Sequence, residues 1–218
     1  MQKKKGKGSL FIVSAPSGAG KTTLCKKLTS TLPHLTHSVS YTTRAQRHGE
    51  VNDRDYTFIS REEFRSMVNK GEFKEWAKIH GELYGTSKKR IEKLIRSGTD
   101  VILDIDTQGA MQLKKKYRGG VYIFVLPPSM EILWKRLKKR MANSKEEIEK
   151  RLKRAVDEIK SYRKYDYVII NNKLNDALRE LESIIISHRL GVKKVDPMWV
   201  KNKFLKQEEE HGSYFSAD

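Results

Sequence analysis

Four short runs of apolar residues recur along the chain, each bounded by polar or turn-forming residues. They occupy residues 10–13, 101–105, 121–126 and 167–170. Continuous apolar runs of this length are typical of strands that are buried on both faces of a parallel sheet. Between them, the residue pattern predicts helices over 22–31, 107–116, 129–140, 145–161 and 174–189. This alternation predicts an α/β fold in which helices flank a parallel sheet.

Residues 36–87 interrupt the alternation. Short alternating stretches and turn residues there predict a small mixed β insertion beside the main sheet. Two helix starts carry a capping box, Ser60 with Glu63 and Ser144 with Glu147. The charged stretch 136–160 predicts a helical arm, whereas the tail after Leu190 loses its periodicity, and the sequence leaves open whether that tail docks or is disordered.

The length and composition narrow the class of protein. A chain of 218 residues can bury one sizeable core, and no apolar run approaches a membrane span. Residues 1–8 are basic but lack the apolar segment of a secretory signal. Cys25 is the only cysteine, which excludes disulfides and cysteine-based zinc sites within one chain. A reducing cytoplasm is therefore the expected location.

The net charge of +18, from 45 Lys and Arg against 27 Asp and Glu, has two interpretations. It could indicate a nucleic-acid-binding protein. It could equally indicate a basic solvated surface together with a polyphosphate site. The chain carries no zinc-finger or RNA-binding signature and no basic motif with interleaved aromatic residues. Nucleic acid is therefore disfavoured as the main ligand.

The strongest motif follows the first apolar run. The phosphate-loop pattern G-x-x-x-x-G-K-[ST] is matched here except at its first glycine, where this chain has Ala15. A strand, a loop of small residues and a helix start present backbone N–H groups to an anion. Lys21 would reach the β- and γ-phosphates, and the Thr22 hydroxyl would bind Mg²⁺. The expected ATP-binding residues are Ala15, Pro16, Ser17, Gly18, Ala19, Gly20, Lys21, Thr22 and Thr23.

Two aspartates close the second apolar run. Asp104 at the end of a neighbouring buried strand is placed to bind Mg²⁺ directly or through water. Asp106 follows two residues later, so along a strand the two side chains would share one face and line one cleft. Asp106 could instead simply cap the next helix.

The insertion contains a second candidate anion site. Ser40, Arg44, Arg47 and Tyr56 lie within one short segment. Two arginines three residues apart can together bind one phosphate group, which would be separate from the phosphate in the loop. A solvated basic loop is the alternative interpretation.

With these motifs in order, the chain resembles the guanylate kinase family over residues 9–190. The matching stretches are APSGAGKTT, SVSYTTRAQRHGE, DYTFIS, EWAKIHGELYGTS, VILDIDTQGA, RLKKR and KRLKRA. The resemblance implies a P-loop nucleoside monophosphate kinase fold that transfers phosphate from ATP to GMP with Mg²⁺. It implies a core at 9–35, 88–126 and 162–190, a GMP-binding domain at 36–87, and a core helix and lid at 127–161. The basic tail 1–8 and the C-terminal tail 191–218 lie outside it.

The resemblance also assigns roles within the GMP site. Arg44, Arg47, Tyr56 and Tyr84 are implied to bind the GMP phosphate. Ser40, Glu75, Thr86 and Asp106 are implied to read the guanine. Guanine offers N1–H and a 2-amino group as donors, which carboxylates accept, and its O6 accepts from hydroxyls. Adenine reverses this edge and would leave a buried carboxylate unpaired, at a cost of about 1–3 kcal/mol.

The lid arginines complete the implied catalytic set, which is Lys21, Arg44, Arg136, Arg140 and Arg151. Positive charge and alignment are what phosphoryl transfer requires from a protein. Thr22 and Asp104 are the expected metal ligands, and ATP and GMP the expected partners. The sequence leaves the oligomeric state open.

Three positions depart from the family pattern. Gln46 replaces a usual proline, Asp53 a common glycine, and Asn172 an aspartate near the adenine. The alternatives to a kinase are a catalytically inactive guanylate-kinase-like binding module and a nucleic-acid-binding ATPase. The intact Gly20-Lys21-Thr22 argues against the first, and the Glu75/Asp106 pair against the second.

Overall fold

The main sheet is parallel throughout and carries the four predicted strands. The computed structural model describes residues 6–79, 81–140 and 145–205. The five strands lie in the order β2-β7-β1-β8-β9 and span Leu35–His37, Asp100–Asp104, Leu10–Ser14, Val121–Leu126 and Tyr167–Ile170. The additional strand, β2, is an edge strand of three residues with one buried apolar side chain, so its pattern is too short to be recognised. It extends the main sheet two residues into the stretch expected to form the insertion.

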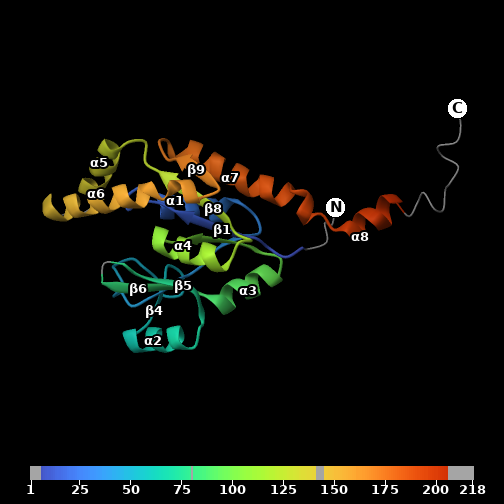
Figure 1. The fold of residues 1–218 in the computed structure, drawn as a ribbon, viewed down its shortest axis with the longest axis horizontal. Coiled ribbons are helices and arrows are strands. Elements are labelled where there is room, and N and C mark those ends of the chain that lie inside the picture. The colour runs from blue at the N-terminus through green and yellow to red at the C-terminus, as the bar shows by residue number, and fades with distance from the viewer. Residues whose placement is uncertain (1–5, 80, 141–144, 206–218) are drawn as a thin grey trace, which may run out of the picture.

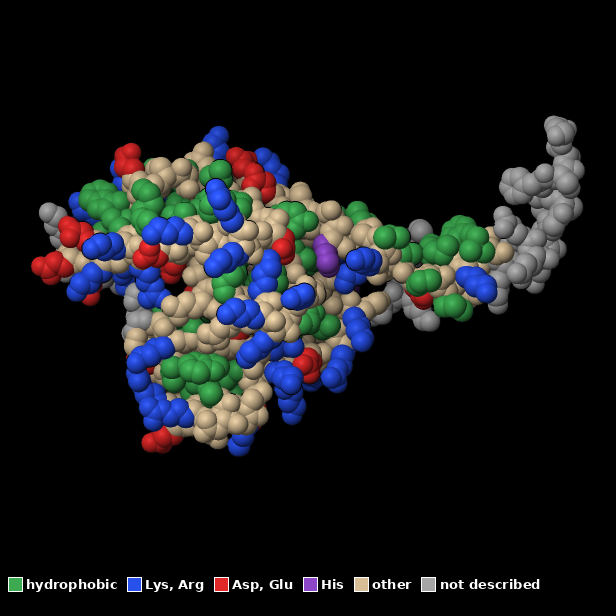
Figure 2. Space-filling view, in the orientation of Figure 1, with side chains coloured by type: hydrophobic (Ala, Val, Ile, Leu, Met, Phe, Trp, Pro, Cys, Tyr) green, Lys and Arg blue, Asp and Glu red, His purple; other side chains and the backbone are tan. Residues whose placement is uncertain are grey.

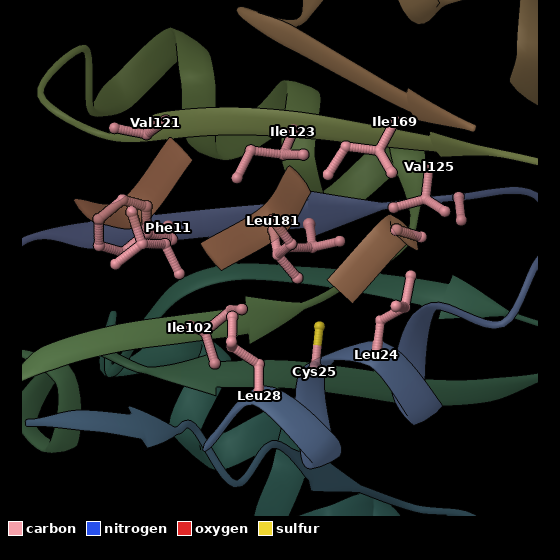
Figure 3. Close-up of a cluster of buried hydrophobic side chains, with 14 of the residues drawn as sticks. Phe11, Leu24, Cys25, Leu28, Ile102, Val121, Ile123, Val125, Ile169 and Leu181 are labelled. Carbon is pink, nitrogen blue, oxygen red and sulfur yellow. The ribbon is translucent and has the colours of Figure 1, made fainter. Parts of the chain in front are cut away.

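Helices cover both faces of this sheet, as predicted. Alternate side chains of β1 point to opposite faces, so Phe11 and Val13 pack under one layer of helices and Leu10 and Ile12 under the other. The first layer is α1 (Lys21–Thr31) and α7 (Leu174–Leu190), which contributes Leu181 to the cluster in Figure 3. The second is α3 (Lys88–Arg96) and α4 (Thr107–Lys116). The two layers bury the sheet and leave its carboxyl-terminal edge to carry the loops.

The predicted insertion is a separate four-stranded sheet in the order β4-β3-β6-β5. Its strands are Thr57–Phe58, Tyr41–Thr42, Glu82–Ser87 and Phe73–Ile79, and its helix α2 spans Arg61–Asn69. The small sheet is mixed, because β3 and β4 are parallel whereas β6 is antiparallel to both its neighbours. The capping box of Ser60 and Glu63 is present at the start of α2. In Figure 1 this sheet and α2 lie below the main sheet.

Two helices form the predicted charged arm. Helix α5 spans Met130–Arg140 and α6 spans Lys145–Lys160, followed by η1 at Tyr162–Lys164. Leu133 and Leu137 of α5 pack with Leu152 and Ala155 of α6 in a small apolar cluster. The expected capping box at Ser144 lies outside the described residues.

The segment after α7 extends away from the body of the protein (Figure 1). It comprises η2 (Val192–Lys194), α8 (Pro197–Val200) and η3 (Lys201–Leu205). Lys and Arg side chains are spread over the whole face shown in Figure 2 rather than gathered in one patch. Among the described helices, none is long and apolar enough to span a membrane.

Candidate active site

The loop between β1 and α1 has the backbone of an anion site. Gly18 and Gly20 both adopt φ of +92°, a left-handed conformation that favours glycine. A Cβ at Gly20 would lie 2.5 Å from Asn171 Nδ2, so a side chain at this position would displace Asn171 from its hydrogen bond to the Ala19 carbonyl. Ala15 is buried and is not among the described residues with positive φ, so alanine fits there without strain. The first glycine of the motif is therefore dispensable in this chain.

Charged groups surround the start of α1. Gly20 occupies the N-cap position and provides no side chain to the first-turn N–H groups, which stay available to a phosphate. Lys21 Nζ donates to the Ile105 carbonyl at 2.8 Å. Burial alone would raise the pKa of Asp104, but the Lys21 charge, the nearby His37 imidazole and the Thr22 hydroxyl lower it to about 2. Asp104 is thus an ionised carboxylate beside the Thr22 hydroxyl.

This donor set fits a magnesium ion. A hydroxyl and one carboxylate are oxygen ligands, and Mg²⁺ usually binds through one or two carboxylates, water and substrate phosphates rather than through a closed protein cage. No cluster of three or more metal-ligating acids, histidines or cysteines occurs among the described residues. Thr22 and Asp104 are therefore the groups that could hold the ion against bound phosphates.

Two side chains brace the loop from outside. Asn171 Nδ2 donates to the Ala19 carbonyl at 2.7 Å, and Arg136 Nη1 donates to the same oxygen at 3.4 Å. Arg136 Nη2 also donates to the Asn171 carbonyl at 2.9 Å. Arg136 thus links α5 to the loop and to the end of β9. Its guanidinium contacts backbone oxygens here rather than an open phosphate position.

The expected GMP-phosphate ligands lie together in one pocket. It is lined by Arg44, Arg47, Tyr56 and Tyr84 from the insertion, and by Thr22 of α1 and Asp104 of β7. The Tyr56 and Tyr84 rings are 5.9 Å apart, and the Arg44 guanidinium lies 5.5 Å from the Tyr56 ring. The insertion therefore brings four dispersed side chains to the edge where the phosphate loop lies.

Glu50 organises the two arginines and was missed by the sequence analysis. Arg44 Nη2 donates to both of its carboxylate oxygens, at 2.8 and 2.9 Å, and the Arg47 backbone N–H donates at 2.9 Å. Burial opposes ionisation, but these donors lower the Glu50 pKa. Its place six residues after Arg44, in a loop, gave no periodic signal.

Three of the four expected base-reading residues border an adjoining pocket, and Thr86 is not part of its lining. Glu75 and Asp106 line this pocket together with four residues that also line the phosphate pocket, namely Ser40, Tyr56, Tyr84 and Asp104. Glu75 is almost fully buried, and burial raises its pKa to about 7 despite a hydrogen bond from the Thr86 hydroxyl. Thr86 itself is fully buried and its proton is donated to Glu75, so in this structure Thr86 supports the carboxylate.

Asp106 caps a helix and lines the pocket at once. Its Oδ1 accepts from the N–H groups of Gln108 and Gly109 at the start of α4. Asp104 is the last residue of β7, and Asp106 has an extended backbone at the N-cap of α4, so only Asp104 lies within the strand. The two still border one pocket. A Cβ at Gly109 would lie 2.5 Å from Glu75 Oε2, so the absent side chain leaves room for the Glu75 carboxylate beside the start of α4.

The second helix of the arm places another predicted arginine, Arg151, beside the loop. Arg151 and Arg154 of α6 line a third pocket with Ala15, Ser17 and Asp106. Arg154 pairs with Glu158 at 3.3 Å, and burial raises the Glu158 pKa. The side chain of Arg140, the remaining predicted lid arginine, lies outside the described residues.

The structure gives a physical account of two of the three departures. Gln46 Nε2 donates to the Glu50 carbonyl at 2.6 Å. This hydrogen bond restrains the loop between Arg44 and Glu50, which a proline at position 46 would make more rigid. Asp53 adopts φ of +59°, the conformation for which glycine is common, and accepts from Thr57 Oγ1 at 2.6 Å and Arg90 Nη2 at 3.3 Å. Asn172 is exposed, and its side chain contacts nothing that explains the substitution.

A glycine-bearing phosphate loop on a parallel sheet, facing an arginine-lined pocket of an inserted sheet, is typical of the P-loop kinase class of enzyme. The family model described as guanylate kinase matches residues 7–188. The guanylate kinase of Geobacter metallireducens is 56% identical over 185 residues, which cover 85% of this chain and 91% of the relative. That of Geobacter sulfurreducens is 50% identical over 191 residues, covering 88% and 94%.

A solved structure agrees with these relatives. The crystal structure of guanylate kinase from Anaplasma phagocytophilum superposes with a TM-score of 0.76 at 32% identity, and covers 93% of this chain and 98% of its own. The chain belongs to the guanylate kinase family and is an enzyme of the nucleoside monophosphate kinase type.

Proposed function

We propose that the protein transfers the γ-phosphoryl group of ATP to the phosphate of GMP and forms ADP and GDP. The observation that carries the proposal is the pair of carboxylates, Glu75 and Asp106, in a pocket continuous with Arg44. Two acceptors at the far end of a phosphate site match the N1–H and 2-amino donors of guanine. Ser40 lines the same pocket and offers a hydroxyl to O6.

The phosphate pocket would hold the acceptor phosphate opposite the loop. Arg44 and Arg47 supply its charge, while Tyr56 and Tyr84 supply hydroxyl donors. Because Glu50 already orients Arg44, the guanidinium is held before GMP arrives. Preorganised positive charge of this kind stabilises charge that is redistributed in the transition state.

The donor phosphates would lie on the loop 15–23. Backbone N–H groups at the start of α1 and Lys21 would bind the β- and γ-phosphates. Arg151 and Arg154 face the loop from α6 and would add charge from the other side. Enclosure between the loop and the arm excludes water, so that GMP rather than water accepts the phosphoryl group.

Thr22 and Asp104 would hold Mg²⁺, which supplies positive charge to the bridging phosphates when bound. The solitary Cys25 and the nucleotide substrates favour a cytoplasmic enzyme. The inactive binding-module alternative has no observation in its favour, because the loop glycines, Lys21 and Arg151 are all in place.

The direct test is ADP production from Mg·ATP with GMP, AMP, CMP and UMP supplied separately. We expect ADP and GDP to form together with GMP, and little product with the other three. Turnover with none of them, despite measurable GMP binding, would favour the binding-module alternative.

Lys21→Ala should nearly abolish turnover and leave GMP binding largely intact, because the two phosphates occupy separate sites. An unchanged rate in this variant would contradict the role of the loop.

A further inference from the structure

One buried nitrogen beside the candidate metal ligands has no hydrogen-bond partner. His37 ends β2, next to β7 in the main sheet, and its Nε2 is one of three such buried atoms among the described residues. Its nearest acidic atom is Asp104 Oδ1, at 3.5 Å. A buried imidazole nitrogen without a partner is costly, which indicates that a group absent from the structure completes it.

The groups around His37 and Asp104 favour a cation as the missing partner of His37 Nε2. His37, Asp104 and Thr22 line the same pocket as the candidate acceptor-phosphate site. The two nearby lysines point elsewhere, because Lys21 donates to the Ile105 carbonyl and Lys26 pairs with Asp55. An imidazole nitrogen, a carboxylate and a hydroxyl thus line one pocket, with the first two 3.5 Å apart.

We propose that His37 is a nitrogen ligand of the divalent cation and completes, with Asp104 and Thr22, a mixed nitrogen and oxygen site. This inference rests on the proposed function, which requires the cation. Two donors at roughly 2.0–2.3 Å from one ion are themselves about 3–3.5 Å apart. The separation of 3.5 Å between His37 Nε2 and Asp104 Oδ1 fits this geometry and is long for a hydrogen bond.

An imidazole ligand has a chemical consequence. Oxygen-only sites suit Mg²⁺, whereas imidazole favours first-row transition ions. The site of this protein should therefore bind Mn²⁺ more tightly, relative to Mg²⁺, than a site without His37. Mn²⁺ is also paramagnetic, which allows its ligands to be identified without an activity measurement.

The test is electron spin-echo envelope modulation on the full chain with Mn²⁺ and inorganic tripolyphosphate, a nitrogen-free mimic of the ATP phosphates. We expect a ¹⁴N coupling in the unmodified protein and in His34→Asn, a matched change at an exposed histidine three residues away. The coupling should be absent in His37→Phe, which keeps an aromatic ring. Absence of the coupling from the unmodified protein, or its persistence in His37→Phe, would overturn the proposal.

Metal affinity gives a second measurement. His37→Phe and His37→Asn should each weaken Mn²⁺ binding by about 10- to 100-fold and change Mg²⁺ binding much less. Asparagine keeps a polar group beside Asp104, so it also serves if the phenylalanine variant does not fold. Wild-type Mn²⁺ affinity in His37→Asn would overturn the proposal, because His37 would then only orient Asp104.

Failure of the metal proposal and of the proposed function give different results. GMP-dependent ADP formation with Mg²⁺ in the unmodified protein tests the function and does not depend on a ¹⁴N coupling. An active enzyme whose bound Mn²⁺ lacks the coupling overturns only the role of His37. A ¹⁴N coupling in a protein that does not phosphorylate GMP supports the ligand and overturns the function.

Discussion

Asp53 adopts a left-handed backbone conformation that most residues avoid, and hydrogen bonds to its side chain stabilise that conformation. Its φ is +59°, and its carboxylate accepts from Thr57 and Arg90. Asp53→Ala keeps the strained conformation and removes both bonds. We expect a loss of about 1–2 kcal/mol in the free energy of unfolding, and a fall in Tm of about 2–8 °C, in thermal denaturation.

Asp53→Gly is the matched control for this prediction. Glycine adopts positive φ without a Cβ clash, so this variant should be more stable than Asp53→Ala. Equal stability of Asp53→Ala and the unmodified protein would show that the bonds to Thr57 and Arg90 do not stabilise this conformation.

If Glu75 reads the base as proposed, its raised pKa should make guanine recognition depend on pH. Burial raises its pKa to about 7, and only the ionised carboxylate accepts from both guanine donors. GMP affinity should therefore fall as the pH is lowered from 8 to 6, by up to about tenfold for one protonation. Calorimetric titration of GMP measures this, with ATP binding as the control. A flat GMP profile would remove Glu75 from the base site.

The same group affects stability with the opposite sign. The folded pKa of about 7 lies above the ordinary value of 4.5, so the folded protein binds the extra proton between these pH values. The ligand-free protein should lose stability as the pH rises from 4.5 to 7. Glu75→Gln removes the titrating group and should flatten this part of a Tm-against-pH curve. An unchanged slope in the variant would contradict the raised pKa.

At the scale of elements, the phosphate loop depends on residues far along the chain. Asn171 at the end of β9 and Arg136 on α5 both donate to the Ala19 carbonyl. Asn171→Ala and Arg136→Met should each raise the KM for ATP by about tenfold, because a looser loop presents its N–H groups less well. The GMP dissociation constant should not change.

Steady-state kinetics distinguish this bracing role from a role in the transition state. If Arg136 acted only on the transferring phosphoryl group, Arg136→Met would lower kcat and leave the KM for ATP unchanged. The double variant should be less impaired than the two single effects combined, because both side chains hold one oxygen. Independent, fully additive effects would contradict a shared brace.

Elements also show what the sequence could and could not predict. Long buried strands such as Val121–Leu126 have an unambiguous pattern, and their positions were confirmed. The edge strand Leu35–His37 has only one buried residue and was missed. The phosphate loop was recognised because its chemistry requires residues at fixed spacing. Glu50, Asn171 and His37 were missed because their roles arise from tertiary contacts, which leave no local pattern in the chain.

For the whole molecule, the two sheets are connected by a charged contact as well as by the chain. Lys26 on α1 pairs with Asp55 in the insertion, and this hydrogen bond lowers the Asp55 pKa to about 2. Lys26 is half exposed, so the pair contributes modestly. Lys26→Met and Asp55→Asn should each raise the KM for GMP by about two- to fivefold at low salt.

The salt dependence of that effect provides its control. Screening weakens an exposed ion pair, so the difference between Lys26→Met and the unmodified protein should shrink at 1 M salt. The double variant should resemble either single variant. A KM for GMP that is unaffected by both substitutions would show that the contact does not position the insertion.

Glu75 belongs to the small sheet, whereas Asp106 follows the large sheet and begins α4. If both read the base as proposed, the residues that determine specificity come from two parts of the protein, the small sheet and the large sheet with its helices. Neither part can then recognise guanine alone. A bound GMP would then contact both parts of the protein and hold them together. A wrong base would bind to only one of the two parts. Discrimination against it would then come from incomplete closure of the two parts around the base, as well as from lost hydrogen bonds.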